Sequence, residues 1–580
     1  MNRKSAGQIG PKFSSESLKK EAKRWLKALR AGDTAAIHRL QRTHPQCSST
    51  PGLRDIQHAL ALEHGFASWA ALQLHMADQE LARRSHAERV AEFLEHACLN
   101  YGILPSTAKW DPSYPDDPSR REYAARVLAR HPEIVRDSIH VAVVSGDVAE
   151  VERLLAKDPG AALSKGGLRN LQPLMYLAYS RLPLEAAASN TLMIAGMLLD
   201  AGANPNVQLT DGENPFTAIT GAIGEGERTP TQVPPHSQAD ALVRLLVERG
   251  ANPFDTQALY NTSLWRDSTH WLELLYAYDA AAGRQARWNT ASHGGVRQLD
   301  YLLGNSVARN HVKRAAWLLA HGANPKTRNF YTKGNLHTEA VLHGHSQIAG
   351  LLAAAGANVE TLHSYQAFQA ACMQLDADTA NALLQQHPEY RHAPAALMTA
   401  ARRGHRDAVA LLLRLGVSVN IEDEHGTRAL HQAAWSDDVD LAKLLIASGA
   451  EVDAKERKYH ATALSWAMYL AKPSLIAYLS TVSSDIFCLA KLGDLERLAA
   501  VLSQAPILVT GKRNGATALF SLPEQDEACA VEIAELLLAH GADPRVKDTH
   551  GLTAADLAER HGMAALAELL KEACSGFASP

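Results

Sequence analysis

Apolar residues recur along the chain at the spacing of short helices, and a glycine follows each set. In residues 441–446, Leu441, Leu444 and Leu445 fall on one face of a helix, so that face can bury. Gly449 follows, and glycine adopts the left-handed backbone that ends a helix without steric cost. In most copies an Asn or Asp comes two residues later and suits a turn, because its side chain bonds the local backbone. The pattern predicts a short helix followed by a tight turn.

This arrangement of paired leucines, a short gap and Gly-Ala-Asn or Gly-Ala-Asp returns at a nearly constant interval. From Gly416 to Gly449 the interval is 33 residues, and from Gly322 to Gly356 it is 34. Periods of this size indicate a solenoid, in which each unit stacks only on its neighbours. The copies occupy residues 198–206, 245–253, 318–325, 351–359, 444–453 and 537–544, with a weaker copy at 416–420.

The other half of the unit is best preserved at residues 423–434, and it carries a family resemblance. Gly426 stands where a turn is expected, and Leu430-His431-Gln432-Ala433-Ala434 follows it. The segment resembles an ankyrin repeat, with its turn glycine and its Leu-His-x-Ala-Ala helix, and residues 548–558 are similar to a final ankyrin repeat. The resemblance implies an all-α fold, an ankyrin-repeat solenoid in which helix-turn-helix units form a superhelical stack.

The repeats differ in regularity along the chain. Residues 394–574 follow the pattern closely, whereas residues 131–393 keep it with interruptions. Asp158-Pro159-Gly160 and His387-Pro388-Glu389 replace the Gly-Ala-Asn ending in two units. We therefore expect irregular ankyrin repeats with insertions over 131–393, regular repeats over 394–574 and a short tail over 575–580.

The first 130 residues lack the repeat and predict a helical cap. Amphipathic helices are expected over 18–31 and 53–64, and Ser68 can cap a third helix that begins at Trp69. The string 59–69 resembles a leader found in bacterial ankyrin-repeat proteins, and residues 111–118 form a turn-rich linker. A cap over 1–130 would cover the apolar face that the first repeat otherwise exposes.

Residues 211–301 are irregular in two ways. The unit between Asp211 and Gly250 is lengthened by a loop rich in glycine and proline at 224–235, and large aromatic residues gather further on. Such rings usually fill a core, yet ankyrin units are built mainly from small residues. Core packing is the favoured interpretation. The alternative is a ligand pocket lined by Trp265, Trp271 and Trp288.

Composition and charge narrow the class of protein. Hydrophobic residues make up 46% and charged residues 21%, which is ordinary for a folded protein, and 58 basic side chains nearly balance 62 acidic ones. This balance disfavours nucleic acid and membranes as partners. Six scattered cysteines, no apolar leader and no run of about 18 apolar residues predict a cytoplasmic protein.

Catalytic and metal-binding motifs are largely missing from the sequence. His343-Gly344-His345 invites a metal interpretation, but Gly-His is usual at this place between ankyrin helices, so a structural role is favoured. His431 is likewise expected to hold neighbouring loops together. Asp111, Asp116 and Asp117 could supply paired carboxylates, although a solvated turn explains them better. We expect no catalytic residue, no metal and no cofactor.

The family resemblance indicates where a partner would bind. In an ankyrin unit, residues before the turn glycine form fingertips, and residues near the end of the first helix line a concave groove. Carried over residue by residue, the candidate partner-binding residues are Phe330, Tyr331, Glu424, His425, Trp435, Lys458, Tyr459, Tyr469, Arg513, Asn514, Thr549, His550 and Arg560. Trp, Tyr and Arg are the residue types enriched at interface hot spots.

These features predict a scaffold or adaptor that binds another protein through its concave face and fingertips. The alternative is an unorthodox enzyme or a small-molecule binder with its pocket near residues 211–301. Binding of nucleic acid is a third possibility that the balanced charge disfavours. The step from ankyrin array to protein binding is an analogy from fold to function.

Overall fold

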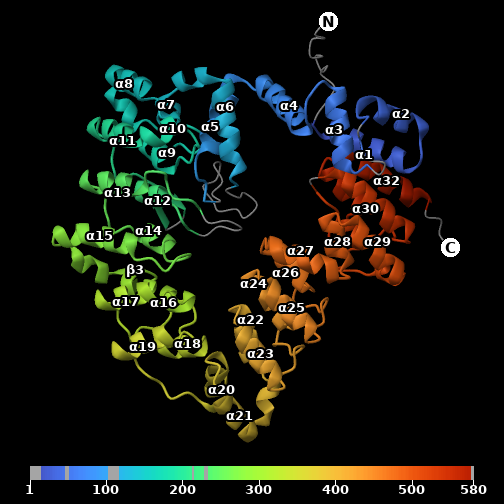
Figure 1. Ribbon diagram of the computed structural model, residues 1–580. Helices are drawn as coiled ribbons and strands as arrows, with labels where there is room; N and C mark the ends of the chain where they lie inside the picture. Colours follow the sequence, from blue (N-terminus) through green and yellow to red (C-terminus); the bar gives the residue numbers. More distant parts are fainter. Residues whose placement is uncertain are drawn as a thin grey trace.

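A computed structural model describes residues 15–45, 47, 51–101, 117–211, 214–226, 233–524 and 526–576. These residues are mostly helical, which confirms the all-α fold class. Most of the expected linker at 111–118, residues 227–232 of the lengthened loop and the end of the tail lie outside the described residues. The chain curves through a wide arc, and in the view of Figure 1 its first helices and its last repeat fall in the same corner.

One regular unit shows how the sequence builds a pair of helices. In α24 (Ala429–Ser436), Leu430 and Ala433 are buried, and in α25 (Val439–Ala447) Leu441 and Leu445 are buried. Asp438 caps the second helix, because its carboxylate accepts a hydrogen bond from the Leu441 amide at 3.0 Å. Gly449 ends the pair at φ +90°, the left-handed conformation expected from the sequence.

The pairs follow one another along the array, and Figure 1 places most of the labelled first helices on the inside of the arc. The inner helices are α7 (Ile139–Ser145), α9 (Pro173–Tyr179), α12 (Ala218–Ile223), α14 (Thr256–Asn261), α16 (Gln298–Arg309), α18 (Leu336–Leu342), α20 (Ser364–Met373), α22 (Ala395–Arg402), α24, α26 (Ala463–Tyr469), α28 (Ile486–Leu492), the short 3-10 helix η6 (Ala518–Phe520) and α31 (Ala554–Arg560).

The outer helices lie on the convex side of the arc. They are α8 (Val148–Lys157), α11 (Thr191–Asp200), α13 (Ala239–Glu248), α15 (His270–Ala281), α17 (Val312–Ala320), α19 (Ser346–Ala354), α21 (Ala377–Gln386), α23 (Arg406–Arg414), α25, α27 (Pro473–Val482), α29 (Leu495–Gln504), α30 (Glu527–Ala539) and α32 (Ala564–Gly576). A short helix, α10 (Glu185–Ser189), precedes α11.

Units that lack the Gly-Ala-Asn ending finish their outer helix in another way. After α8 and α21 the chain enters 3-10 helices that begin at Pro159 and Pro388. Proline suits this first position because its missing N–H would be unpaired there anyway. Two further 3-10 helices, η1 (Pro132–Arg136) and η5 (Pro506–Thr510), also begin with a proline. The 3-10 helix η3 (Gln285–Asn289) ends its unit without one.

Short hairpins mark the irregular segment. β1 (Gln208–Asp211) pairs antiparallel with β2 (Asn214–Thr217), with Leu209 opposite Phe216. β3 (Ala291–His293) pairs antiparallel with β4 (Val296–Arg297), and the register shifts within β3. Both hairpins lie in the loops that enter inner helices α12 and α16, so the lengthened units still return to the stack.

The array contains three apolar cores laid end to end. The first extends from Leu81 to Leu352, the second from Phe368 to Cys488 and the third from Ile486 to Leu570. The first boundary falls before α20, where the array turns sharply in Figure 1. The cores therefore divide the array at its bend and again at α28.

Polar contacts join the second and third cores. Asp485, at the start of α28, accepts hydrogen bonds from the Thr462 hydroxyl at 2.8 Å and from the Arg513 guanidinium at 2.6 Å. Thr462 precedes α26 in the second core, and Arg513 precedes η6 in the third. Burial alone would raise the pKa of Asp485, but the Arg513 charge and these hydrogen bonds hold it below its usual value.

The amino-terminal segment forms a separate small core. It contains α1 (Ser15–Arg30), α3 (Leu53–Glu63) and α4 (Trp69–Arg83), near the positions that the sequence predicts, together with α2 (Thr34–Thr43), which the sequence analysis missed. The Ser68 hydroxyl caps α4 by accepting from the Ala71 amide at 3.1 Å, as expected. Leu60 and Met76 belong to this core.

Helix α4 connects this leader core to the array. Met76 packs in the leader core, whereas Leu81, further along the same helix, packs in the first core of the array. The helices that follow, α5 (His86–Ala97) and α6 (Ser119–Arg130), lie within the 1–130 segment yet contribute Phe93 and Ala124 to the array core. One helix therefore links two cores that share no buried side chain.

Because the leader core is separate, a cavity made in it should affect the leader alone. We expect Leu60→Ala, at a fully buried position, to destabilise the leader by about 2–5 kcal/mol. Hydrogen exchange should show faster exchange over α1–α4 and unchanged exchange in α11–α13. Leu246→Ala, equally buried in the array, should give the reverse pattern. Equal loss of protection in both regions would show that the two cores unfold together.

Candidate functional site

The concave face exposes large apolar side chains at the ends of the inner helices. Leu375 follows α20, Trp435 lies near the end of α24, Tyr469 ends α26 and Leu492 ends α28. We call these four residues the concave row. Tyr469 is 90% exposed and Trp435 is 48% exposed, so both present apolar surface to solvent. The sequence placed Trp435 and Tyr469 in the groove but missed Leu375 and Leu492.

Neighbouring side chains orient the Trp435 ring. The Arg402 guanidinium lies 5.5 Å from its centroid, and the Trp466 ring stands edge-on to it at 6.5 Å. Arg402 is itself held by a hydrogen bond from Nε to the Gln432 side-chain oxygen at 2.8 Å. The exposed Trp435 ring is thus pre-positioned, which lowers the entropy lost when a partner binds.

The loops that carry the predicted fingertips are held by buried or capping carboxylates. Glu456, which is 3% exposed, accepts hydrogen bonds from the amides of Lys458 at 2.7 Å and Tyr459 at 2.6 Å. Asp423 does the same for the His425 amide at 2.9 Å. The side chains of Glu424, His425, Lys458 and Tyr459 remain exposed at the ends of these rigid loops.

The predicted fingertip at residues 330–331 has one exposed aromatic residue and one that packs against the core. Tyr331 is exposed, and its hydroxyl lies 2.7 Å from that of Tyr301. Phe330 is half-buried and packs edge-on against Tyr301 at 5.5 Å. Only Tyr331 of this pair offers a substantial surface to a partner.

Among the predicted partner-binding residues of the last repeats, all but Arg513 are exposed. Asn514 has φ +51° in a turn and is exposed, as are His550 and Arg560. Arg513 is different, since its side chain pairs with the buried carboxylate of Asp485 and its guanidinium lies 4.6 Å from the Phe487 ring centroid. Arg513 therefore joins two cores of the array and offers a partner little surface.

The predicted histidines take structural positions. His431 connects two units: its Nδ1 accepts from the Arg428 amide at 3.2 Å and its Nε2 lies 3.2 Å from the Ala461 carbonyl oxygen. His345 lies 2.8 Å from the Val307 carbonyl oxygen through Nδ1. Within the described ranges, no three His, Cys, Asp or Glu side chains gather as a metal site would require.

The aromatic cluster of the irregular segment is largely core. Trp288 is fully buried, donates from Nε1 to the Asp279 carboxylate at 2.8 Å and packs against Tyr276 and Phe254. Trp265 donates to the Gly226 carbonyl at 2.6 Å. Core packing, the favoured interpretation of the sequence, thus holds for Trp288.

Trp271 differs from the other two tryptophans because it lines a pocket of about 500 Å³ at the start of α13 and α15. The pocket also contains Glu225, whose pKa burial raises to about 6, and His270, which lies 2.8 Å from the Asp240 carboxylate. A pocket thus exists in the region where the sequence analysis placed one, but Trp265 and Trp288 do not line it.

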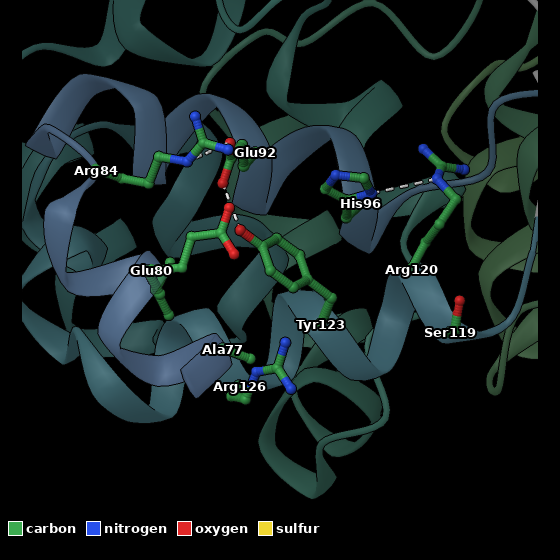
Figure 2. A pocket seen from close by; sticks show the side chains of 10 residues that line it. Ala77, Glu80, Arg84, Glu92, His96, Ser119, Arg120, Tyr123 and Arg126 are labelled. Carbon is green, nitrogen blue, oxygen red and sulfur yellow. Dashed lines mark hydrogen bonds and ion pairs between the residues drawn. The ribbon is translucent and has the colours of Figure 1, made fainter. Parts of the chain in front are cut away.

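A second pocket, of about 410 Å³, lies between α4, α5 and α6 and was not foreseen (Figure 2). Glu92 pairs with Arg84 at 3.4 Å and accepts from the Tyr123 hydroxyl at 2.5 Å on one side of it. Burial and this hydrogen bond raise the pKa of Tyr123 to about 12. Sequence patterns could not reveal this pocket, because it forms where the helix that links leader and array meets α6.

The stacked helix pairs with glycine turns define a helical repeat solenoid. Residues 367–456 match the family model described as ankyrin repeats (3 copies). The chain is 26% identical over 193 residues to the putative ankyrin repeat protein YahD of Escherichia coli (strain K12), which covers 31% of this chain and 96% of YahD. Residues 367–456 are thus ankyrin repeats, and the two matches together support an ankyrin-repeat family.

A further relative shares only a small part of its length with this chain. The potassium channel AKT2/3 of Arabidopsis thaliana is 28% identical over 155 residues, which is 27% of this chain and 16% of the channel. The similarity thus covers a minor fraction of the channel. Among the described residues, no helix is long and apolar enough to cross a bilayer.

The Arg513 pair provides a test of how the array is held together. We expect Arg513→Ala to lower the free energy of unfolding by about 3–5 kcal/mol, because it leaves the buried Asp485 carboxylate without its cation. Lys458→Ala, at an exposed fingertip, should change it by less than about 0.5 kcal/mol. Urea unfolding followed by circular dichroism measures both. Equal stability of the two variants would contradict the structural role of the pair.

Proposed function

We propose that this protein is a scaffold or adaptor that holds a partner polypeptide against its concave face in the cytoplasm. The observation that supports this most is the concave row, in which four inner helices, three of them consecutive (α24, α26 and α28), each leave a large apolar side chain exposed. Isolated exposed apolar residues are ordinary, but a contiguous set on one face is typical of an interaction site. Ankyrin repeats are generally protein-interaction modules, which agrees with this use.

The rigidity of the surface also supports a binding role. Buried or capping carboxylates hold the fingertip loops, and Trp435 is fixed between Arg402 and Trp466. A partner would therefore meet a preformed surface, and little side-chain ordering would oppose association. Aromatic residues at such positions are frequent hot spots. The partner surface we propose combines the concave row with the fingertip residues Tyr331 and Tyr459.

The pocket beside Trp271 favours a second candidate function, the binding of a small molecule. Its carboxylates, histidines and one aromatic wall converge as such sites require. Two observations make it the weaker candidate. His270 and Asp240 already pair with each other, and Trp288 fills a core instead of the pocket. Protein binding at the concave face is the better-supported proposal.

A triple variant tests the proposed surface. Replacement of Trp435, Tyr459 and Tyr469 by alanine removes three exposed rings, and partner recovery from cell extract should fall by about tenfold or more, since a single hot spot contributes about 2 kcal/mol or more. Met193→Ala removes an apolar side chain about as exposed as Tyr459 from outer helix α11 and should leave recovery unchanged. Full recovery of every partner by the folded triple variant would exclude this surface.

A further inference from the structure

Side chains from three repeats meet on the concave face where the array bends. Arg403, just after α22, donates from Nη1 to the Ala308 carbonyl near the end of α16. Its Nη2 also donates to Nδ1 of His343, just after α18, at 3.0 Å. One guanidinium therefore spans the ends of α16, α18 and α22, across the boundary between the first and second cores.

Positive charge gathers at this point without an opposing ion pair. Arg309, Arg402 and Arg403, which we call the arginine cluster, form no ion pair within the described part of the chain. Arg406, by contrast, pairs with Asp438 at 2.7 Å and Asp440 at 2.8 Å. The arginines of the cluster thus lack the close ion pairs that Arg406 makes.

The charge of Glu339 acts on Arg403 from a distance, without an ion pair between the two side chains. Glu339 instead accepts hydrogen bonds from the side-chain amide of Asn329 at 2.9 Å and from the Thr332 hydroxyl. Arg403 is exposed, although neighbouring groups partly desolvate its guanidinium. This desolvation and the neighbouring charges of Arg402 and Arg309 lower its pKa.

The histidine in the cluster adds no charge that could repel a cation or attract an anion near neutral pH. His343 accepts a hydrogen bond from Arg403 through Nδ1, which requires an unprotonated nitrogen there. Desolvation and the Arg403 charge lower its pKa to about 3. His343 is therefore a neutral acceptor that positions Arg403, and the charge of the hollow comes from the arginines.

Apolar surface begins directly beside the arginine cluster. The Arg402 guanidinium lies 5.5 Å from the Trp435 ring centroid, and the remainder of the concave row continues from there towards α28. Leu375, at the end of α20, belongs to the helix between α18 and α22. A ligand that covers Arg402 and Trp435 would meet a guanidinium group and an exposed aromatic ring side by side.

We propose that the bend of the concave face binds an acidic segment of a partner polypeptide. Its Asp or Glu side chains would pair with the arginine cluster, and its apolar side chains would cover Leu375 and Trp435. Guanidinium groups bind carboxylates through paired hydrogen bonds, so charge and geometry both match. This inference rests on the proposed function and adds to it the chemistry of the partner.

A polypeptide matches the site better than nucleic acid does. Nucleic-acid grooves follow the phosphate backbone with many basic side chains, whereas this cluster is short and the chain has more acidic than basic residues overall. The surface beyond it is apolar and leads to the uncharged side chains of Tyr469 and Leu492. An acidic segment with apolar residues meets both parts of the surface.

Selection from a displayed library of random peptides on the full chain tests the proposal. The selected peptides should be rich in Asp and Glu next to aromatic or aliphatic residues. Arg309→Gln combined with Arg402→Gln should weaken them about tenfold or more, because charge-assisted hydrogen bonds are lost. Their binding should also weaken as salt rises. These exposed arginines are chosen because Arg403 also holds the bend together.

Matched controls separate the possible results. Arg414→Gln removes an exposed arginine from outer helix α23 of the same unit and should leave peptide binding unchanged. Selected peptides without acidic enrichment, or acidic peptides that bind the double variant equally well, would overturn the acidic-segment proposal alone. Failure to select any peptide that competes at Trp435 would count against the proposed function itself. Tighter binding of a single-stranded oligonucleotide than of any acidic peptide would also overturn the proposal.

Discussion

No helix pair in this chain can bury its apolar face alone, and the shape of the array follows from this constraint. Each inner helix must pack against the inner helices before and after it, so small side chains such as Ala433 and Ala434 are buried at these contacts. The inner helices are mostly shorter than the outer ones, as α24 and α25 illustrate with 8 and 9 residues. Stacking such units curves the array with its inner helices inside the arc.

This curvature explains why the binding surface lies where it does. Large side chains at the ends of several inner helices remain exposed because the next unit does not cover them, and Tyr469 is the extreme case. Where one core ends and the next begins, polar contacts replace apolar packing. Arg513 with Asp485 joins one boundary, and Arg403 with His343 joins the other on the concave side. The second contact also leaves positive charge facing the hollow.

The sequence predicted the solenoid and the left-handed glycines from repeat periodicity, whereas the groove positions of Trp435 and Tyr469 were implied by the resemblance to ankyrin repeats. It could not predict that Arg513 pairs with Asp485. The motif places Arg513 at a fingertip, and nothing in the motif indicates a buried carboxylate in the preceding unit. Leu375 was not predicted because its unit is degenerate. The arginine cluster was not predicted because the groups that Arg403 contacts lie several repeats away in the sequence. The pocket beside α4 depends on packing between leader and array, which no periodicity encodes.

The claim that a partner binds inside the arc is tested most directly by hydroxyl-radical footprinting of the protein alone and in complex with a captured partner. Trp435 and Tyr469 are exposed on the concave face, whereas Met193 is exposed on the outer helix α11. The account predicts that the partner slows oxidation of Trp435 and Tyr469 and leaves that of Met193 unchanged. Protection of Met193, with Trp435 and Tyr469 oxidised as fast as in the free protein, would contradict it.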